Sequence, residues 1–146
     1  MSVLVIADHD GAHLRDTTHK TVTAAQGLGG DIDVLVYGEG VGAVAAQAAK
    51  IAGVRKVLTA ESAELKQDIA EAVAALVAGL AAGYDAVAVP ASSAGKNFAP
   101  RVAALLDVSL LSDVIQVVHG NTFVRPIYAG NALDTVQTSE AKKVLT

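Results

Sequence analysis

Residues 34–43 read Val-Leu-Val-Tyr-Gly-Glu-Gly-Val-Gly-Ala, a buried β-strand pattern that runs through a glycine-rich turn into a helical pattern. The turn fits G-x-G-x-x-A, in which glycines allow the backbone to approach a pyrophosphate at a helix N-terminus. Glu61 follows about 20 residues later, where an acid that binds a ribose hydroxyl is expected. That motif normally follows the first strand of its fold, whereas here it follows the second. The stretch predicts an α/β fold and leaves two alternatives for the turn, a dinucleotide site and a plain tight turn.

Strand and helix patterns alternate on both sides of this stretch. The predicted strands are short, rich in β-branched residues and expected to be buried on both faces, as in parallel sheets; they are 3–7, 32–37, 54–59 and 86–89. The predicted helices show apolar residues every three or four positions; they are 14–28, 41–52, 65–80 and 98–106, the last with Pro100 in its first turn. This alternation predicts three βαβ units with helices covering a mainly parallel sheet.

The pattern changes after Asp107. Two strand-like runs, 109–118 and 122–128, flank a turn at 119–121, and no long helix follows. The polar stretch 138–143 is expected to be frayed or an edge strand. We therefore predict one domain over residues 1–146, a Rossmann-like α/β three-layer sandwich with a mainly parallel sheet that ends in antiparallel strands.

Composition narrows the possible functions. The chain has no Cys, which excludes disulfides, thiolate metal sites and a cysteine nucleophile. Its net charge is −4 and its 11 Lys and Arg residues are scattered, so we expect no nucleic-acid partner. Aromatic residues make up only 3%, which leaves little ring surface for stacking a flavin. No apolar run is long enough for a membrane span and no signal peptide is recognisable, so we expect a cytoplasmic protein without membrane insertion.

Two groups of polar residues could carry chemistry. The first loop gathers Asp8, His9, Asp10 and His13, which are ligand types for a metal, but an acidic solvated turn explains them equally well and we predict no metal. His19 and His119 have no Ser or carboxylate at the spacing of a triad, so we predict no catalytic residue and no enzyme activity.

The second group lies in the loop that joins a strand to a helix at 90–101. Ser92, Ser93, Gly95 and Lys96 favour negative charge at a helix N-terminus, so they are candidates for binding an anion or a nucleotide. The full phosphate-loop pattern is missing, and helix capping and packing explain the same residues.

Two stretches of the sequence point to a family. ASSAGKNFAPRVAALLDVSLLSDV at 91–114 and RPIYAGNAL at 125–133 resemble the signature stretches of electron-transfer flavoprotein α subunits. Weaker matches extend the resemblance over essentially the whole chain. It implies an N-terminal domain of the adenine-nucleotide α-hydrolase-like fold, which pairs with a β subunit and supports a C-terminal domain that carries FAD. That FAD-binding domain is expected after residue 146 and is absent from this sequence.

The resemblance implies an electron carrier that works as a heterodimer. With its β subunit and FAD it would shuttle electrons from flavin dehydrogenases to an acceptor, whereas this chain alone would not bind FAD. Arg101, Tyr128 and Asn131 become candidates for the interface with the β subunit or the flavin domain. From the residues alone, Tyr128 is expected to be half-buried in a hairpin and Asn131 to form a turn. The alternative is a free-standing AMP- or ATP-binding module of the universal-stress-protein type that uses residues 92–96.

Overall fold

A computed structural model describes residues 1–146 of the protein. Its first half alternates strands and helices: β1 Ser2–Ile6, α1 Asp16–Leu28, β2 Asp31–Gly38, α2 Gly42–Ala48, β3 Val54–Glu61, the 3₁₀ turn η1 Ala63–Leu65, α3 Ala70–Ala81 and β4 Ala86–Ala88. The second half comprises α4 Ser93–Leu105, β5 Leu110–Leu111, β6 Gln116–His119, β7 Thr122–Ile127, the 3₁₀ turn η2 Tyr128–Gly130, β8 Ala132–Gln137 and β9 Lys143–Leu145. None of the helices combines the length and the apolar character that a membrane span needs.

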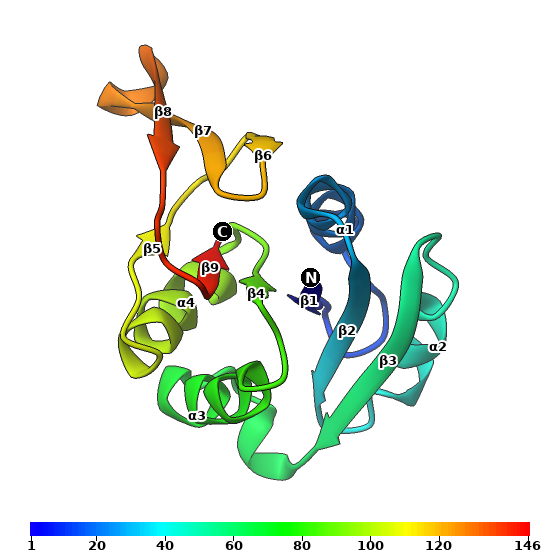
Figure 1. Ribbon diagram of the computed structural model, residues 1–146. Helices are drawn as coiled ribbons and strands as arrows, with labels where there is room; N and C mark the ends of the chain where they lie inside the picture. Colours follow the sequence, from blue (N-terminus) through cyan, green and yellow to red (C-terminus); the bar gives the residue numbers. More distant parts are fainter.

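The main sheet has six strands in the order β3-β2-β1-β4-β9-β5, and every neighbouring pair is parallel (Figure 1). From β1 the chain moves outward to β2 and β3, then crosses back to β4 on the other side of β1. The order of the strands therefore reverses between β1 and β4. The predicted fold class, an α/β sandwich with a mainly parallel sheet and additional antiparallel strands, is confirmed.

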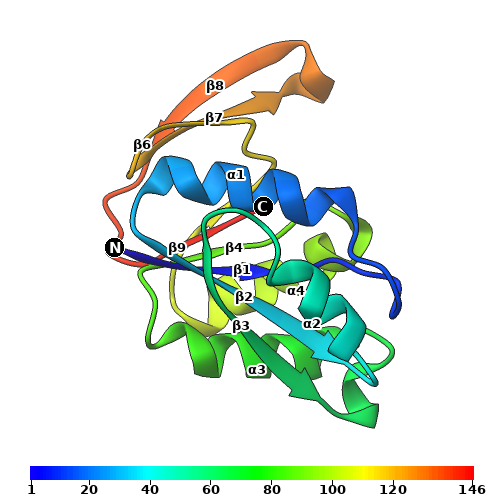
Figure 2. The same cartoon turned by 90° about the vertical axis from the view of Figure 1, so that its right-hand side faces the viewer.

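Two apolar clusters, one on each face of the sheet, form the core. One joins α1 and α2 to the sheet through Val22, Ala25 and Val44, and the other joins α3 and α4 through Val77 and Val102. Figure 2 shows α1 and the small antiparallel sheet on one side of the main sheet and α3 on the other. Branched residues that alternate along β1 and β2 supply both clusters, which is why the central strands appear as continuous apolar runs.

Two predictions about individual elements are wrong. The strand at 54–59 is not buried on both faces, because β3 lies at the edge of the sheet and is partly exposed along its length. Pro100 does not lie in a first turn, because α4 begins at Ser93 and contains Pro100 in its interior. Pro100 is exposed, and its missing N–H leaves the carbonyl of Lys96 without its intrahelical donor on a face that water can reach.

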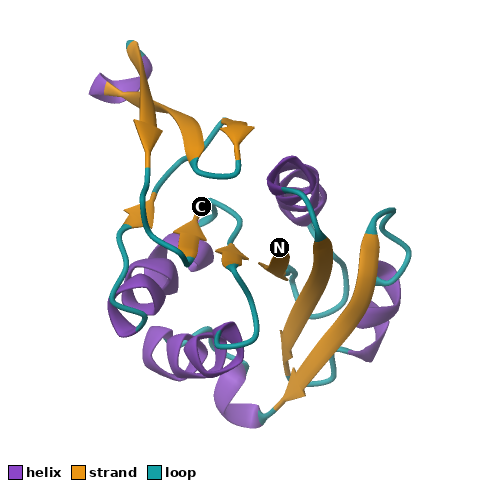
Figure 3. Cartoon of the chain, viewed as in Figure 1, coloured by secondary structure: helices purple, strands orange, loops and turns teal.

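The segment between β5 and β9 forms a second, antiparallel sheet in the order β6-β7-β8. It stands apart from the main sheet (Figure 3). The side chain of Phe123 on β7 is fully buried and packs into the apolar cluster under α1, which connects the two sheets. The chain then returns to the main sheet, where β9 lies between β4 and β5. The prediction of a frayed or edge segment at 138–143 therefore fails at Lys143, which begins an interior strand and is 6% exposed.

A buried carboxylate ties three strands together at the α3 face of the sheet. Asp33 of β2 has no exposed surface and accepts hydrogen bonds from Arg55 Nε at 2.9 Å and Arg55 Nη2 at 2.7 Å. The Tyr84 hydroxyl, just before β4, donates to Asp33 at 2.6 Å. Burial alone would raise the pKa of Asp33, but the bonds from Arg55 and Tyr84 outweigh it and hold this pKa below the usual 3.8. Burial, reinforced by Asp33, also raises the pKa of Tyr84 to about 12.

We predict that Asp33→Asn lowers the free energy of unfolding at pH 7 by about 2 kcal/mol, because it removes a charged hydrogen-bond acceptor from a buried site. The lowered pKa means that Asp33 stabilises the fold at neutral pH and that this contribution is lost as pH falls below about 4. Urea unfolding of the variant and the parent should therefore show a smaller difference in the free energy of unfolding at pH 3 than at pH 7. Asp31→Asn, which removes an exposed partner of the same Arg55, is the matched control and should change stability little. An equal effect of both variants would contradict the role given to Asp33.

Candidate functional site

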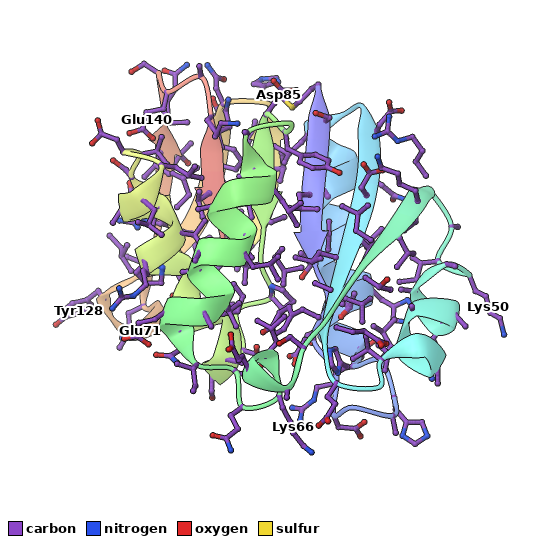
Figure 4. All side chains as sticks on the ribbon, turned by 90° about the horizontal axis from the view of Figure 1, so that it is seen from below. Lys50, Lys66, Glu71, Asp85, Tyr128 and Glu140 are labelled. Carbon is purple, nitrogen blue, oxygen red and sulfur yellow. The ribbon has the colours of Figure 1, made fainter.

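A cleft opens at the carboxyl ends of β1, β2 and β4, where the strand order reverses. Open α/β sheets place their ligands at this position because the loops on either side of the reversal diverge. The loops after β1, β2 and β4 and the segment between η1 and α3 supply the walls, which are lined by His9, Asp10, Arg15, Tyr37, Glu39, Lys66, Asp68 and Ser92. The part of the cleft between the loops after β1 and β2 has a volume of about 430 Å³. Lys66, labelled in Figure 4, marks this end of the molecule, and Asp85 marks the opposite end.

The loop after β1 is held in place by His9. Its Nε2 donates to the Tyr37 carbonyl at 2.8 Å, and its Nδ1 accepts the Gly11 N–H at 3.0 Å. Because a carbonyl can only accept, these bonds select the neutral ring with its proton on Nε2. Asp10 closes the same loop by accepting the N–H groups of Ala12 and His13, bonds that hold the pKa of Asp10 below its usual value.

Tyr37, near the end of β2, forms the inner wall of the cleft. Its ring contacts His9 edge-on at 6.2 Å between centroids and Phe98 of α4 at 6.3 Å. Tyr37 is only 4% exposed. Burial, followed by the charges of Asp68 and Asp8, raises the pKa of its hydroxyl, so that the phenol stays neutral.

The loop after β4 approaches the sheet closely before α4 begins. Ser92 caps the helix, since its Oγ accepts the Gly95 N–H at 3.3 Å. A Cβ atom on Gly95 would lie 2.0 Å from the Pro90 carbonyl oxygen. Glycine is therefore required at this position for packing, which was one of the two interpretations of the loop.

The family model described as "Electron transfer flavoprotein domain" matches residues 3–146. The chain belongs to the electron transfer flavoprotein family. It is 54% identical over 146 residues to the electron transfer flavoprotein subunit alpha of Pseudomonas aeruginosa, an alignment that covers 100% of this chain and 47% of that protein. The corresponding subunit of Bradyrhizobium diazoefficiens is 56% identical over 146 residues, with 46% of its length covered. A probable mitochondrial subunit alpha of Caenorhabditis elegans is 41% identical over 147 residues, with 44% covered.

The chain thus spans about half the length of the curated relatives that it matches, and the matched part is their N-terminal part. The family resemblance predicted from the stretches at 91–114 and 125–133 is confirmed, because the family model matches residues 3–146 and the bacterial relatives align with the whole chain. In this member of the electron transfer flavoprotein family the two signature stretches occupy different places. The first forms the loop after β4 and helix α4, and the second forms β7 and the turn into β8.

The structure separates the predicted site residues into two groups. Ser92, Ser93 and Gly95 line the cleft and its inner end. Lys96 does not, because its Nζ binds Asp113 Oδ1 at 2.6 Å. In this arrangement Lys96 therefore does not supply a positive charge to the nucleotide site predicted at 92–96.

The interface candidates lie away from the cleft. Arg101 of α4 binds Glu71 of α3 at 3.1 Å, and Glu71 is labelled in Figure 4. The prediction of a half-buried Tyr128 is wrong, because this side chain is 82% exposed and extends outward in Figure 4. The prediction for Asn131 as a turn former agrees with the bond from its Nδ2 to the Tyr128 carbonyl at 2.9 Å.

The glycine turn after β2 and the first loop have structural explanations. Glu61 Oε1 accepts the Val41 N–H at 3.1 Å, so its carboxylate occupies the position at the start of α2 where a pyrophosphate would bind. This favours the plain-turn interpretation over the dinucleotide site. The structure contains no group of three or more His, Cys, Asp or Glu residues arranged to hold a metal ion.

Sequence reasoning missed Tyr37 and Asp68. Tyr37 lies at the end of the apolar run that predicts the strand at 32–37, and an aromatic residue near the carboxyl end of a central strand is the signal that could have identified it. Asp68 lies in a polar connection whose position depends on how α3 packs, and no local pattern marks it.

We predict opposite effects from two glycine-to-alanine substitutions. Gly95→Ala should lower the free energy of unfolding by about 2 kcal/mol or more, because the new methyl group meets a backbone carbonyl. Gly79→Ala, in α3 where a Cβ meets nothing within 4 Å, should raise it by about 0.5–1 kcal/mol because alanine favours the helix. Urea denaturation of both variants measures this pair. Stabilisation by Gly95→Ala would show that the loop after β4 is not packed as described.

Proposed function

We propose that the chain is the scaffold and subunit-interface domain of an electron-transfer flavoprotein α subunit. In this proposal it binds a β subunit, and the complete complex with FAD shuttles electrons from flavin dehydrogenases to an acceptor. The domain itself is not catalytic. Membership of the family and the whole-chain similarity to α subunits support this role.

The observation that carries the interface role is an apolar rim on the antiparallel sheet. The rim consists of Ile127, Tyr128 and Leu133, which are 40%, 82% and 65% exposed. All three lie within the signature stretch RPIYAGNAL. Neighbouring exposed apolar side chains on a soluble domain typically mark a surface that a partner covers.

The backbone of the rim supports the same role. Tyr128 and Ala129 have φ angles of 51° and 52°, a left-handed conformation that costs non-glycine residues about 1–3 kcal/mol each. Such strain is typical of segments that position a side chain for binding. The Asn131 side chain holds this turn by its bond to the Tyr128 carbonyl. The strained turn presents the Tyr128 ring to solvent, which favours contact with a partner subunit.

We expect Leu133→Asp to weaken the complex with the β subunit at least about tenfold, since a charge would be buried in an apolar contact. Co-expression of the two subunits followed by size-exclusion chromatography and a binding titration measures the loss. Leu105→Asp on α4 is the matched control, because this leucine is 58% exposed but lies outside the rim. A complex that tolerates Leu133→Asp, or that loses affinity equally with Leu105→Asp, would contradict the proposed interface.

FAD is proposed to belong to the complete complex, and the alternative function is AMP or ATP binding by this chain alone. Calorimetric titration of the purified chain with FAD, AMP and ATP up to millimolar concentration separates the two. We expect no heat of binding from any of them, because Arg15 and Lys66 in the cleft are already paired with Asp8 and Glu39. Saturable AMP or ATP binding would favour the nucleotide-binding module instead, and FAD binding would contradict the assignment of flavin to the complete complex.

A further inference from the structure

The two sheets of the molecule have four edge strands, and three of these carry features that hinder further pairing. β3 carries Arg55 and Lys56 and has a register shift against β2. β5 is only two residues long. β6 has a register shift against β7 and lies against α1, where a Cβ atom on Gly27 would be 3.2 Å from Val117. Short strands, bulges and charged side chains are the usual means by which proteins keep another strand from pairing with an edge.

The fourth edge strand, β8, has none of these features. It pairs with β7 over all six of its residues without a register shift. It contains no proline, lysine or arginine. Its one charged residue, Asp134, points to the same face of the sheet as the buried Phe123 and therefore does not guard the edge. Figure 2 shows β8 as the outermost strand of the molecule. The free edge of β8 is thus open to another strand.

The hydrogen-bond pattern identifies the backbone groups at this edge. The Thr138 N–H donates to the Asn121 carbonyl at 2.9 Å, which makes these two residues a hydrogen-bonded pair. Hydrogen-bonded pairs alternate along antiparallel strands, so the register directs the N–H and C=O groups of residues 134 and 136 toward β7. The same groups of the residues between and beside them point away from β7; these residues are Leu133, Thr135 and Gln137, and all three are exposed. An extended segment beside β8 would therefore meet backbone donors and acceptors that β7 does not use.

Two properties of the molecule favour the β subunit as the source of this segment. Leu133 belongs both to the edge and to the apolar rim, so a partner that covers the rim also reaches β8. A second copy of this chain is disfavoured, because each copy has a net charge of −4 and two copies repel each other. The segment that fits the edge is extended and has an apolar side chain against Leu133.

We propose that the β subunit adds a strand to the free edge of β8, with backbone hydrogen bonds to Leu133, Thr135 and Gln137. In this mode of binding the main-chain bonds supply affinity and the side-chain contacts supply specificity. The proposal rests on the interface role of the rim and extends it, because the rim alone predicts only side-chain contacts.

The test is a binding titration of the β subunit with Thr135→Pro, which removes the central N–H donor of the edge. Proline is tolerated at free strand edges, so this variant should keep the circular dichroism spectrum of the parent. We expect its binding to be at least about tenfold weaker. Thr135→Val is the matched control, because it changes the same side chain but keeps the N–H, and it should bind as the parent does. Parent-like binding by Thr135→Pro, or equal weakening by Thr135→Val, would overturn the proposal.

A second measurement uses the unsubstituted chain and does not depend on how the proline variant folds. The shift of an amide proton changes less with temperature when the proton is hydrogen-bonded, and this change is measured in the ¹⁵N-labelled chain alone and in the complex. In the free chain the change should be large at residues 133, 135 and 137 and small at 134 and 136. In the complex it should be small at all of them. An alternation that persists in the complex would overturn the proposal.

Strand addition and the interface role can fail separately. If Leu133→Asp weakens the complex and Thr135→Pro does not, the rim belongs to the interface but no strand pairs with β8. If neither variant weakens the complex, both the interface role and strand addition are contradicted. Sedimentation of the isolated chain tests the second copy as the occupant. We expect a monomer, and a dimer that Thr135→Pro abolishes would show that β8 pairs with another copy of this chain, which would overturn the proposal.

Discussion

The return of the chain to the main sheet as β9 is the constraint on which the rest of the structure depends. Three residues, Lys143–Leu145, pair in parallel with β4 on one side and β5 on the other. Val144 and Leu145 are almost completely buried, each in a different apolar cluster. Without β9 the edge made by β5 would have no neighbour, because β4 and β5 do not contact each other in the sheet. A strand supplied late in the sequence thus closes a sheet that begins at residue 2.

The end of the chain at β9 also positions the two candidate functional regions, the cleft and the apolar rim. The Val89 N–H donates to the Leu145 carbonyl, which positions the loop after β4 at the cleft. The Val114 N–H donates to the Thr146 carbonyl, which holds the segment leading into the antiparallel sheet. The cleft and the apolar rim are therefore attached to one rigid element but lie in different parts of the molecule.

The local sequence pattern was enough to predict the fully buried strands and the turn whose conformation depends on its own glycines. The apolar runs of β1, β2 and β4 and the glycine turn after β2 needed no tertiary information. β9 could not be predicted, because a three-residue strand inside a polar segment has no periodicity and is defined only by distant partners. Pro100 suggested a late start for α4, whereas the Ser92 cap sets the true start. In the cleft, Ser92 was predicted but Tyr37 was not, because its place at the inner wall depends on how its ring packs against His9 and Phe98.

The central claim is that the antiparallel sheet presents an apolar rim to the β subunit of an electron-transfer flavoprotein. Amide hydrogen exchange of the chain, measured alone and with a β subunit, tests this most directly. In the free chain the amides of the turn at residues 128–131 should exchange rapidly, because they lie outside the paired residues of β7 and β8. Binding should slow exchange there more than anywhere else. Protection confined to α2 and β3, with residues 127–133 unchanged, would contradict the account.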